Sequence, residues 1–252
     1  MEKGILFLHG LEAGINGEKG LFLRKNFKNC IYPDLEVSIY KIHKANSILR
    51  LILLNPIFIC LISALTIFCY YICTKIGLIV GIPINVLLFV ISLLLTKKFF
   101  IRKAVDIAMD NNIYVAYREI IKYNPKVLIG SSWGGAVALT LIKRGLWTGH
   151  TIVLAPAFYA VNKIIYNNMT DKIMEFQLKN LKGYGGKIIV YHSLLDNVIP
   201  FRDSEFLCEN KQNTCQHFEL RIIKDDNHSL KSLIGEPDYI LKRDVEKLLN
   251  IF

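Results

Sequence analysis

The chain has 252 residues, 52% of them apolar, and a formal net charge of +10. This length suits one large α/β domain, and the apolar fraction lies above the usual range because of one concentrated stretch. The basic balance favours contact with an anionic membrane surface over nucleic acid, since no nucleic-acid motif and no basic run with interleaved aromatic residues is present. The six cysteines form no pair of C-x-x-C motifs, so neither a zinc site nor a disulfide framework is expected, and no cofactor is predicted.

The N-terminal part begins with an apolar run over residues 4–8 that predicts a buried strand ending at His9-Gly10. It is too short and too early for the apolar core of a signal peptide. A short helix over 21–27 and a second strand at 30–32 follow. Residues 36–50 then form a polar, mildly basic connector without clear periodicity.

An apolar hairpin interrupts this pattern. Residues 51–73 and 76–95 carry no charge, and only Thr74-Lys75 separates them. Each segment is long enough to cross a hydrocarbon core of about 30 Å at about 1.5 Å per residue. Both ends of the hairpin are flanked by basic residues, namely Lys41, Lys44 and Arg50 before it and Lys97, Lys98, Arg102 and Lys103 after it.

The positive-inside rule therefore predicts an integral membrane protein with two transmembrane helices. Residues 51–96 are the predicted transmembrane hairpin. Residues 1–50 and 97–252 are expected in the cytoplasm as one discontinuous domain. A pair of buried core helices is the alternative interpretation of the hairpin.

Helices and strands alternate in the rest of the chain. Strands are expected at 127–129, 150–154, 187–191 and 217–223, and helices over 105–123, 136–141, 159–181, 198–208 and 239–252. This alternation predicts an α/β fold with a mostly parallel sheet flanked by helices.

The segment Gly130-Ser131-Ser132-Trp133-Gly134 joins the strand at 127–129 to a helix, which is the context of a nucleophile elbow. The glycines two residues before and after Ser132 avoid collisions at a sharp turn. The N-terminus of the following helix stabilises negative charge that develops nearby. A Gly/Ser turn that fits the pattern by chance is the alternative.

A serine nucleophile needs a base, and the base needs an orienting carboxylate. Asp196 follows the strand at 187–191 and His228 follows the strand at 217–223. Both are therefore expected at the carboxyl edge of the sheet, where ligands bind in open α/β folds. Asp225 and Asp226 remain rival acids, although they lie very close to His228 in sequence.

Backbone N–H groups of Leu11 and Trp133 are the expected donors of an oxyanion hole. His9 could act as a base. A structural role in shaping its loop is favoured, because it precedes the serine and is expected to lack a nearby carboxylate. His192 is expected to support its loop, and Asp34 to stabilise a turn.

Several of these motifs together resemble the α/β-hydrolase superfamily, especially its small serine esterases with little or no cap. They are Leu8-His9-Gly10, Tyr32-Pro33-Asp34-Leu35, the stretch 130–135, the stretch 192–200 and Asp226-Asn227-His228-Ser229. The resemblance covers residues 3–35 and about 104–252. It implies a Ser132–His228–Asp196 catalytic triad that cleaves an ester or thioester through an acyl-enzyme. The departures are His192-Ser193, where His-Gly is common, and the apolar hairpin, which leaves the substrate class open.

The sequence thus predicts a membrane-anchored serine hydrolase of the carboxylesterase, thioesterase or lipase type. Its expected partners are membrane lipids and an acyl ester or thioester substrate, without nucleic acid. The alternative is a catalytically inactive membrane module of the same fold that binds a lipid or a protein. If the strand at 30–32 runs parallel to the elbow strand, the hairpin leaves the domain at the active-site edge of the sheet.

Overall fold

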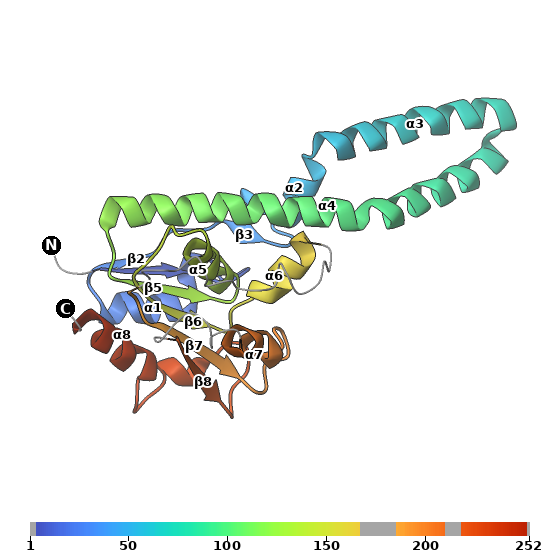
Figure 1. The fold of residues 1–252 in the computed structure, drawn as a ribbon. Coiled ribbons are helices and arrows are strands. Elements are labelled where there is room, and N and C mark those ends of the chain that lie inside the picture. Colours follow the sequence, from blue (N-terminus) through green and yellow to red (C-terminus); the bar gives the residue numbers. More distant parts are fainter. Residues whose placement is uncertain (1–3, 167–184, 210–217, 251–252) are drawn as a thin grey trace.

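The computed structural model describes residues 4–166, 185–209 and 218–250. Six parallel strands form one sheet in the order β2-β1-β5-β6-β7-β8 (Figure 1). The strands are β1 (Ile5–Leu8), β2 (Cys30–Ile31), β5 (Val127–Ser131), β6 (His150–Leu154), β7 (Ile188–Ser193) and β8 (Phe218–Ile223). Every residue of β1, β5, β6 and β7 is buried, which explains their continuous apolar runs. The predicted parallel α/β fold is confirmed.

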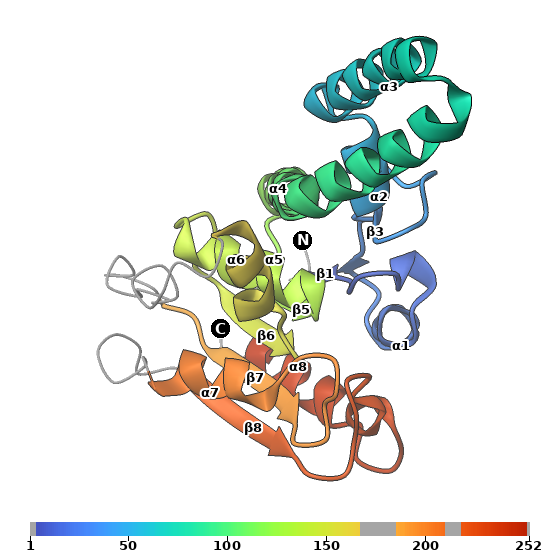
Figure 2. The same ribbon diagram turned by 90° about the vertical axis from the view of Figure 1, so that its right-hand side faces the viewer.

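Helices cover both faces of this sheet (Figure 2). One face packs against α1 (Glu18–Asn26) and α8 (Ile240–Asn250), and its core contains Ile5, Phe7 and Ile129. The other face packs against α4 (Leu78–Tyr123), α5 (Trp133–Lys143), α6 (Phe158–Ile165) and α7 (Phe201–Glu209). Two short 3-10 helices, at Gly14–Asn16 and Lys231–Ile234, lie in loops. The helix predicted over 159–181 is described only as far as α6, and the rest lies outside the described residues.

The apolar hairpin forms an antiparallel pair of helices that projects beyond the carboxyl edge of the sheet (Figure 1). Its first helix, α3, spans Pro56–Ile76 rather than beginning at residue 51. A separate helix, α2 (Ile48–Leu53), precedes it. The side chain of Asn55 caps α3 by accepting hydrogen bonds from the N–H groups of Ile57 and Phe58 at 2.9 and 3.3 Å. Pro56 occupies the first turn, where its missing N–H costs nothing.

The second helix of the hairpin does not end where the charges begin. It is the first part of α4, which has 46 residues in all and ends at Tyr123. Lys and Arg are good helix formers, so the basic cluster at 97–103 marks no boundary. The later part of α4 buries a stripe of residues against the sheet, namely Ala104, Val105, Ala108, Met109, Ile113, Ala116 and Ile120.

In the described part of the chain, α3 is the one helix that is long and apolar enough to cross a membrane by itself. Its residues 56–75 have a mean hydropathy of 2.2, and none of them is buried. In α4, the segments 82–92 and 96–123 meet at a 45° bend and qualify as a second span only when taken together. Two transmembrane helices therefore remain a prediction.

The connector at 36–50, expected to be irregular, contains regular structure. Val37–Ser38 (β3) and Asn46–Ser47 (β4) pair in parallel to form a small second sheet. The pairing depends on contacts that side-chain periodicity does not encode, such as the bond from the Asn46 amide to the carbonyl of Leu35 at 2.8 Å. This sheet leads directly into α2 at the base of the hairpin.

Candidate active site

Ser132 lies at the sharp turn between β5 and α5, with φ 52° and ψ −111°. A Cβ at Gly130 would lie 2.4 Å from the carbonyl oxygen of Gly134, and a Cβ at Gly134 would lie 2.1 Å from the carbonyl oxygen of Leu8. Only glycine fits at either position, which is the physical reason for the motif. The strained backbone presents a partly exposed Ser132 at the end of the strand.

His228 links this serine to a carboxylate. Its Nε2 atom lies 3.0 Å from Ser132 Oγ, and its Nδ1 atom lies 2.7 Å from Asp196 Oδ2. A carboxylate accepts hydrogen bonds, so Nδ1 carries the proton and Nε2 is free to accept one from the serine hydroxyl. The structure thus brings together Ser132, His228 and Asp196 from the ends of β5, β8 and β7.

The side chain of Asp196 is fully buried but well supplied with donors. Its Oδ1 accepts hydrogen bonds from the N–H groups of Val198 and Ile199 at 2.8 and 2.9 Å. Burial alone would raise the pKa of this carboxyl. The bonds from Ile199, His228 and Val198 outweigh burial and lower its pKa below the usual value. Asp196 therefore stays ionised beside the imidazole.

The rival acids are placed elsewhere. Asp226 Oδ2 accepts hydrogen bonds from the N–H and the hydroxyl of Ser232 at 2.8 and 2.7 Å. Asp225 is exposed. Of the three candidate carboxylates, Asp196 is the one hydrogen-bonded to His228.

His192 is buried directly behind the acid loop. Its Nε2 atom donates to the carbonyl of Ile199 at 3.0 Å and lies 3.2 Å from Asp196 Oδ2. Its Nδ1 atom accepts from the hydroxyl of Ser204 at 2.7 Å. Burial lowers the pKa of His192, which keeps the ring neutral in this arrangement. These contacts match the loop-supporting role expected for it.

The two expected oxyanion donors lie on segments that adjoin Ser132. Trp133 is the first residue of α5, so its N–H is among those that a helix leaves unpaired at its N-terminus. Gly10, which precedes Leu11, packs against the serine: a Cβ there would lie 3.2 Å from Ser132 Cβ and 3.3 Å from the carbonyl oxygen of Ser131. The loop after β1 therefore passes beside the nucleophile.

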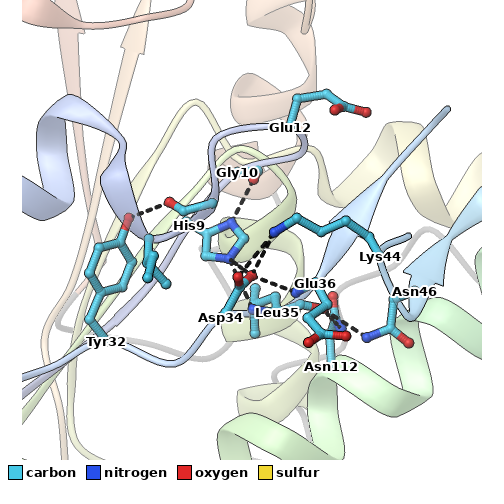
Figure 3. A network of polar contacts seen from close by, with 12 residues as sticks. His9, Gly10, Glu12, Tyr32, Asp34, Leu35, Glu36, Lys44, Asn46 and Asn112 are labelled. Carbon is cyan, nitrogen blue, oxygen red and sulfur yellow. Dashed lines mark hydrogen bonds and ion pairs between the residues drawn. The ribbon is translucent and has the colours of Figure 1, made fainter. Parts of the chain in front are cut away.

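His9 has a different environment from the one expected. A carboxylate is near it, because Asp34 Oδ1 lies 3.2 Å from His9 Nε2 (Figure 3). The N–H of Leu35 donates to that same Nε2 at 2.9 Å, so the ring proton is on Nδ1, where it is donated to the carbonyl of Gly10 at 2.8 Å. Lys44 Nζ binds both oxygens of Asp34, at 3.1 and 3.0 Å.

The expectation that His9 lacks a carboxylate was wrong, because Asp34 reaches it from a distant part of the sequence. Burial lowers the pKa of His9 despite this neighbour. Both ring nitrogens are occupied by the loop backbone, and the hydroxyl of Ser132 is bonded to His228 instead. Asp34 also stabilises its own turn, as expected, by accepting from the N–H of Glu36 at 2.8 Å.

One residue of the site region was not found from the sequence. Asn112, in the C-terminal third of α4, is fully buried and accepts a hydrogen bond from Trp133 Nε1 at 2.7 Å. The sequence signal that could have identified Asn112 is its place as a polar residue among the apolar residues of one face of α4. Among the described residues, no group of three or more His, Cys, Asp or Glu side chains could hold a metal ion.

No protein-family profile and no curated protein sequence matches this chain. Solved structures are similar to it in fold. TT1662 from Thermus thermophilus aligns with a TM-score of 0.58 at 11% identity, covering 100% of this chain and 91% of that one. Est1E from Butyrivibrio proteoclasticus aligns with a TM-score of 0.51 at 11% identity, covering 99% and 90%. A Xanthomonas campestris pv. campestris protein, named for the alpha/beta hydrolase superfamily, aligns with a TM-score of 0.51 at 15% identity, covering 100% of both chains.

At these identities the likeness establishes the fold alone. The chain has the α/β-hydrolase-type fold, with a parallel sheet flanked by helices, as the sequence predicted. Activity and site roles rest on the geometry of this chain's own residues.

Proposed function

We propose that the protein is a serine hydrolase that cleaves an ester or thioester through Ser132, His228 and Asp196. The observation that carries the proposal is the continuous chain of hydrogen bonds from Ser132 Oγ through His228 to Asp196. His228 takes the proton of Ser132 as its oxygen attacks the acyl carbon, and Asp196 stabilises the imidazolium that forms. The imidazolium then protonates the leaving group. Water, activated by the same histidine, cleaves the acyl-enzyme.

The tetrahedral intermediates carry negative charge on the former carbonyl oxygen. The N–H groups of Trp133 and Leu11 are the proposed donors to that oxygen, supported by the position of Trp133 at the start of α5 and by the contact of Gly10 with Ser132. Such preorganised donors typically account for the largest electrostatic contribution to acyl transfer.

The proposed setting is the cytoplasmic surface of a membrane, with α3 and the first part of α4 inserted. Large apolar side chains are exposed along both hairpin helices, including Ile67, Phe68, Leu87 and Phe89. Soluble proteins rarely expose a continuous apolar surface along two helices, and a lipid bilayer would cover it. The hairpin leaves the domain on the carboxyl side of the sheet (Figure 1), and Ser132 directly follows the carboxyl end of β5. We therefore propose that substrates come from the membrane, as lipid esters or as acyl groups on membrane-bound proteins.

The test is hydrolysis of a panel of ester and thioester substrates by the full chain in vesicles. Wild type should release acid from at least one class, and Ser132→Ala should not. If a folded wild type cleaved no member of the panel, the alternative of an inactive membrane module would gain support. Flotation of the chain with vesicles tests the membrane association separately from catalysis.

A further inference from the structure

Asn112 occupies an unusual position for an amide side chain. It lies in the C-terminal third of α4, has 0% exposure, and shares its helix face with the apolar residues that pack on the sheet. A buried amide is costly unless its donor and acceptor are both bonded. Here both are bonded, and the two bonds lead to different parts of the proposed active site.

The first bond leads to the elbow. The oxygen of Asn112 accepts a hydrogen bond from Trp133 Nε1 at 2.7 Å, so it fixes the indole of the residue that directly follows Ser132. The backbone N–H of Trp133 is one of the two proposed oxyanion donors. Holding the indole restrains the orientation of that peptide unit.

The second bond leads to the loop after β1. The nitrogen of Asn112 donates to the carbonyl of Leu35 at 2.9 Å. The N–H of Leu35 donates to His9 Nε2, and His9 Nδ1 donates to the carbonyl of Gly10 (Figure 3). That carbonyl belongs to the peptide unit whose N–H is the other proposed oxyanion donor, that of Leu11. Every bond along this route is buried.

We propose that Asn112 is a positioning residue that holds both halves of the oxyanion hole in register from a single point on α4. This inference rests on the proposed function, because it assigns a role within the same reaction. As a result, α4, whose first part is one arm of the hairpin, is linked by hydrogen bonds to both segments of the proposed oxyanion hole. The amide is suited to this place because it donates in one direction and accepts in the other, which neither a carboxylate nor an apolar side chain does.

The bond to Leu35 can be removed without leaving its carbonyl unpaired, since the amide of Asn46 also donates to it at 2.8 Å. Asn112→Leu keeps the approximate volume and removes both bonds of Asn112. Trp133→Phe keeps the backbone N–H and removes only the indole donor. A third variant, Asp110→Asn, is the control on the same helix, because it removes the charge from another contact of α4, namely the ion pair of Asp110 with Arg144 at the end of α5, at 2.8 Å.

The experiment measures kcat and KM of these variants on the best substrate of the panel, with the full chain in vesicles. Asn112→Leu should lower kcat by roughly 10- to 100-fold, because a displaced oxyanion donor loses most of its value while substrate binding is unchanged. KM and the pH of half-maximal activity should stay as in wild type, since the hydrogen bonds of Asn112 go to Leu35 and Trp133 rather than to the proposed triad. Asp110→Asn should behave as wild type.

The double variant gives a second readout. If Asn112 and Trp133 act through their shared bond, Asn112→Leu with Trp133→Phe should lose no more kcat than Asn112→Leu alone. Losses that multiply would mean that the two side chains act independently and would overturn the inference. A folded Asn112→Leu with wild-type kcat, or one whose loss falls on KM, would also overturn it.

Trp133→Phe covers the case in which Asn112→Leu does not fold. It should lower kcat by a smaller factor, about 3- to 10-fold, at unchanged KM, because only one of the two branches is cut. An unchanged kcat in that variant would contradict the inference. These results are separable from failure of the proposed function, in which wild type itself would be inactive.

Discussion

The Nε2 atom of His192 lies 3.2 Å from Oδ2 of Asp196, the oxygen that is also bonded to His228. Both side chains are fully buried. His192 also bonds the carbonyl of Ile199, whose N–H is one of the donors to Asp196. His192 therefore supports the proposed catalytic acid in two ways. It contacts Oδ2 of Asp196 directly, and it bonds the loop whose N–H groups donate to Asp196.

Replacing His192 should make the position of the Asp196 carboxylate less fixed while the carboxylate itself remains. We expect His192→Leu to lower kcat by about 10-fold, much less than the loss of a triad member, because Asp196 keeps its two backbone donors. Steady-state kinetics against Ser204→Ala, which removes only the hydroxyl bonded to the far side of the ring, provide the comparison. A kcat of Ser204→Ala as low as that of His192→Leu would mean that ring orientation, rather than contact with Asp196, is what matters.

Two buried histidines should make the fold sensitive to mild acid. Burial lowers the pKa of both His9 and His192, so a proton binds the unfolded chain more readily than the folded one. Their contribution to stability is complete above the unfolded pKa of about 6.5, and it is lost as pH falls from there toward the lower folded pKa. Each can change the free energy of unfolding by at most about 1.4 kcal/mol per pH unit.

Thermal unfolding between pH 7.5 and 5.5 measures this effect. The melting temperature of wild type should fall across the interval, and that of His192→Leu should fall less steeply from a lower starting value. Carboxylates with a lowered pKa, such as Asp196, titrate below this pH range and do not contribute to the change in melting temperature. Equal slopes in the two proteins would mean that His192 does not contribute to the pH dependence of stability.

The membrane topology gives a prediction that does not depend on catalysis. With both flanks of the hairpin basic, single cysteines at the exposed positions Lys25 and Arg243 should be protected from an impermeant reagent in intact cells. Both should react after the membrane is permeabilised. A cysteine in place of Lys75, near the hairpin turn, should react without permeabilisation. Labelling at Lys25 or Arg243 in intact cells would place the domain on the other side.

The hairpin can be removed near its base. Phe58 of α3 contacts Phe100 of α4, with ring centroids 5.1 Å apart, so the chain ends left by deletion of 57–98 lie close together. A variant with a short Gly/Ser linker there keeps α2 and the buried stripe of α4. It should cleave short water-soluble esters as wild type does, and lose most of its activity on substrates presented in vesicles. Equal loss on both kinds of substrate would mean that the hairpin supports the fold, and full activity on vesicles would refute a membrane-derived substrate.

Local patterns were sufficient to predict much of the fold. The apolar runs of β5, β6 and β7 are fully buried strands, and the order of Ser132, Asp196 and His228 at strand ends brings them together at one edge. The contacts that were not predicted join residues that lie far apart in the sequence. Asp34 reaches His9 across 25 residues, and Asn112 reaches Leu35 across 77.

Helix boundaries were a second source of error. The change from apolar to basic residues near Lys97 marks a change of environment, whereas α4 continues past it as a helix, with a 45° bend between residues 92 and 96. Asn55, by contrast, follows the end of α2 and caps α3 inside a stretch that is uniformly uncharged. Composition predicts what surrounds a helix, and capping residues predict where it begins.

In the proposed mechanism, Ser132 is a nucleophile activated by His228 and Asp196. Covalent labelling by a fluorophosphonate probe tests this role, when its rate and position are read by mass spectrometry of the modified peptide. We expect one adduct, on Ser132, that is absent in Ser132→Ala. Labelling should be slowed by about 10³-fold or more in Asp196→Asn and unchanged in Asp226→Asn. An adduct on another residue, or Asp226→Asn slowed where Asp196→Asn is not, would contradict this mechanism.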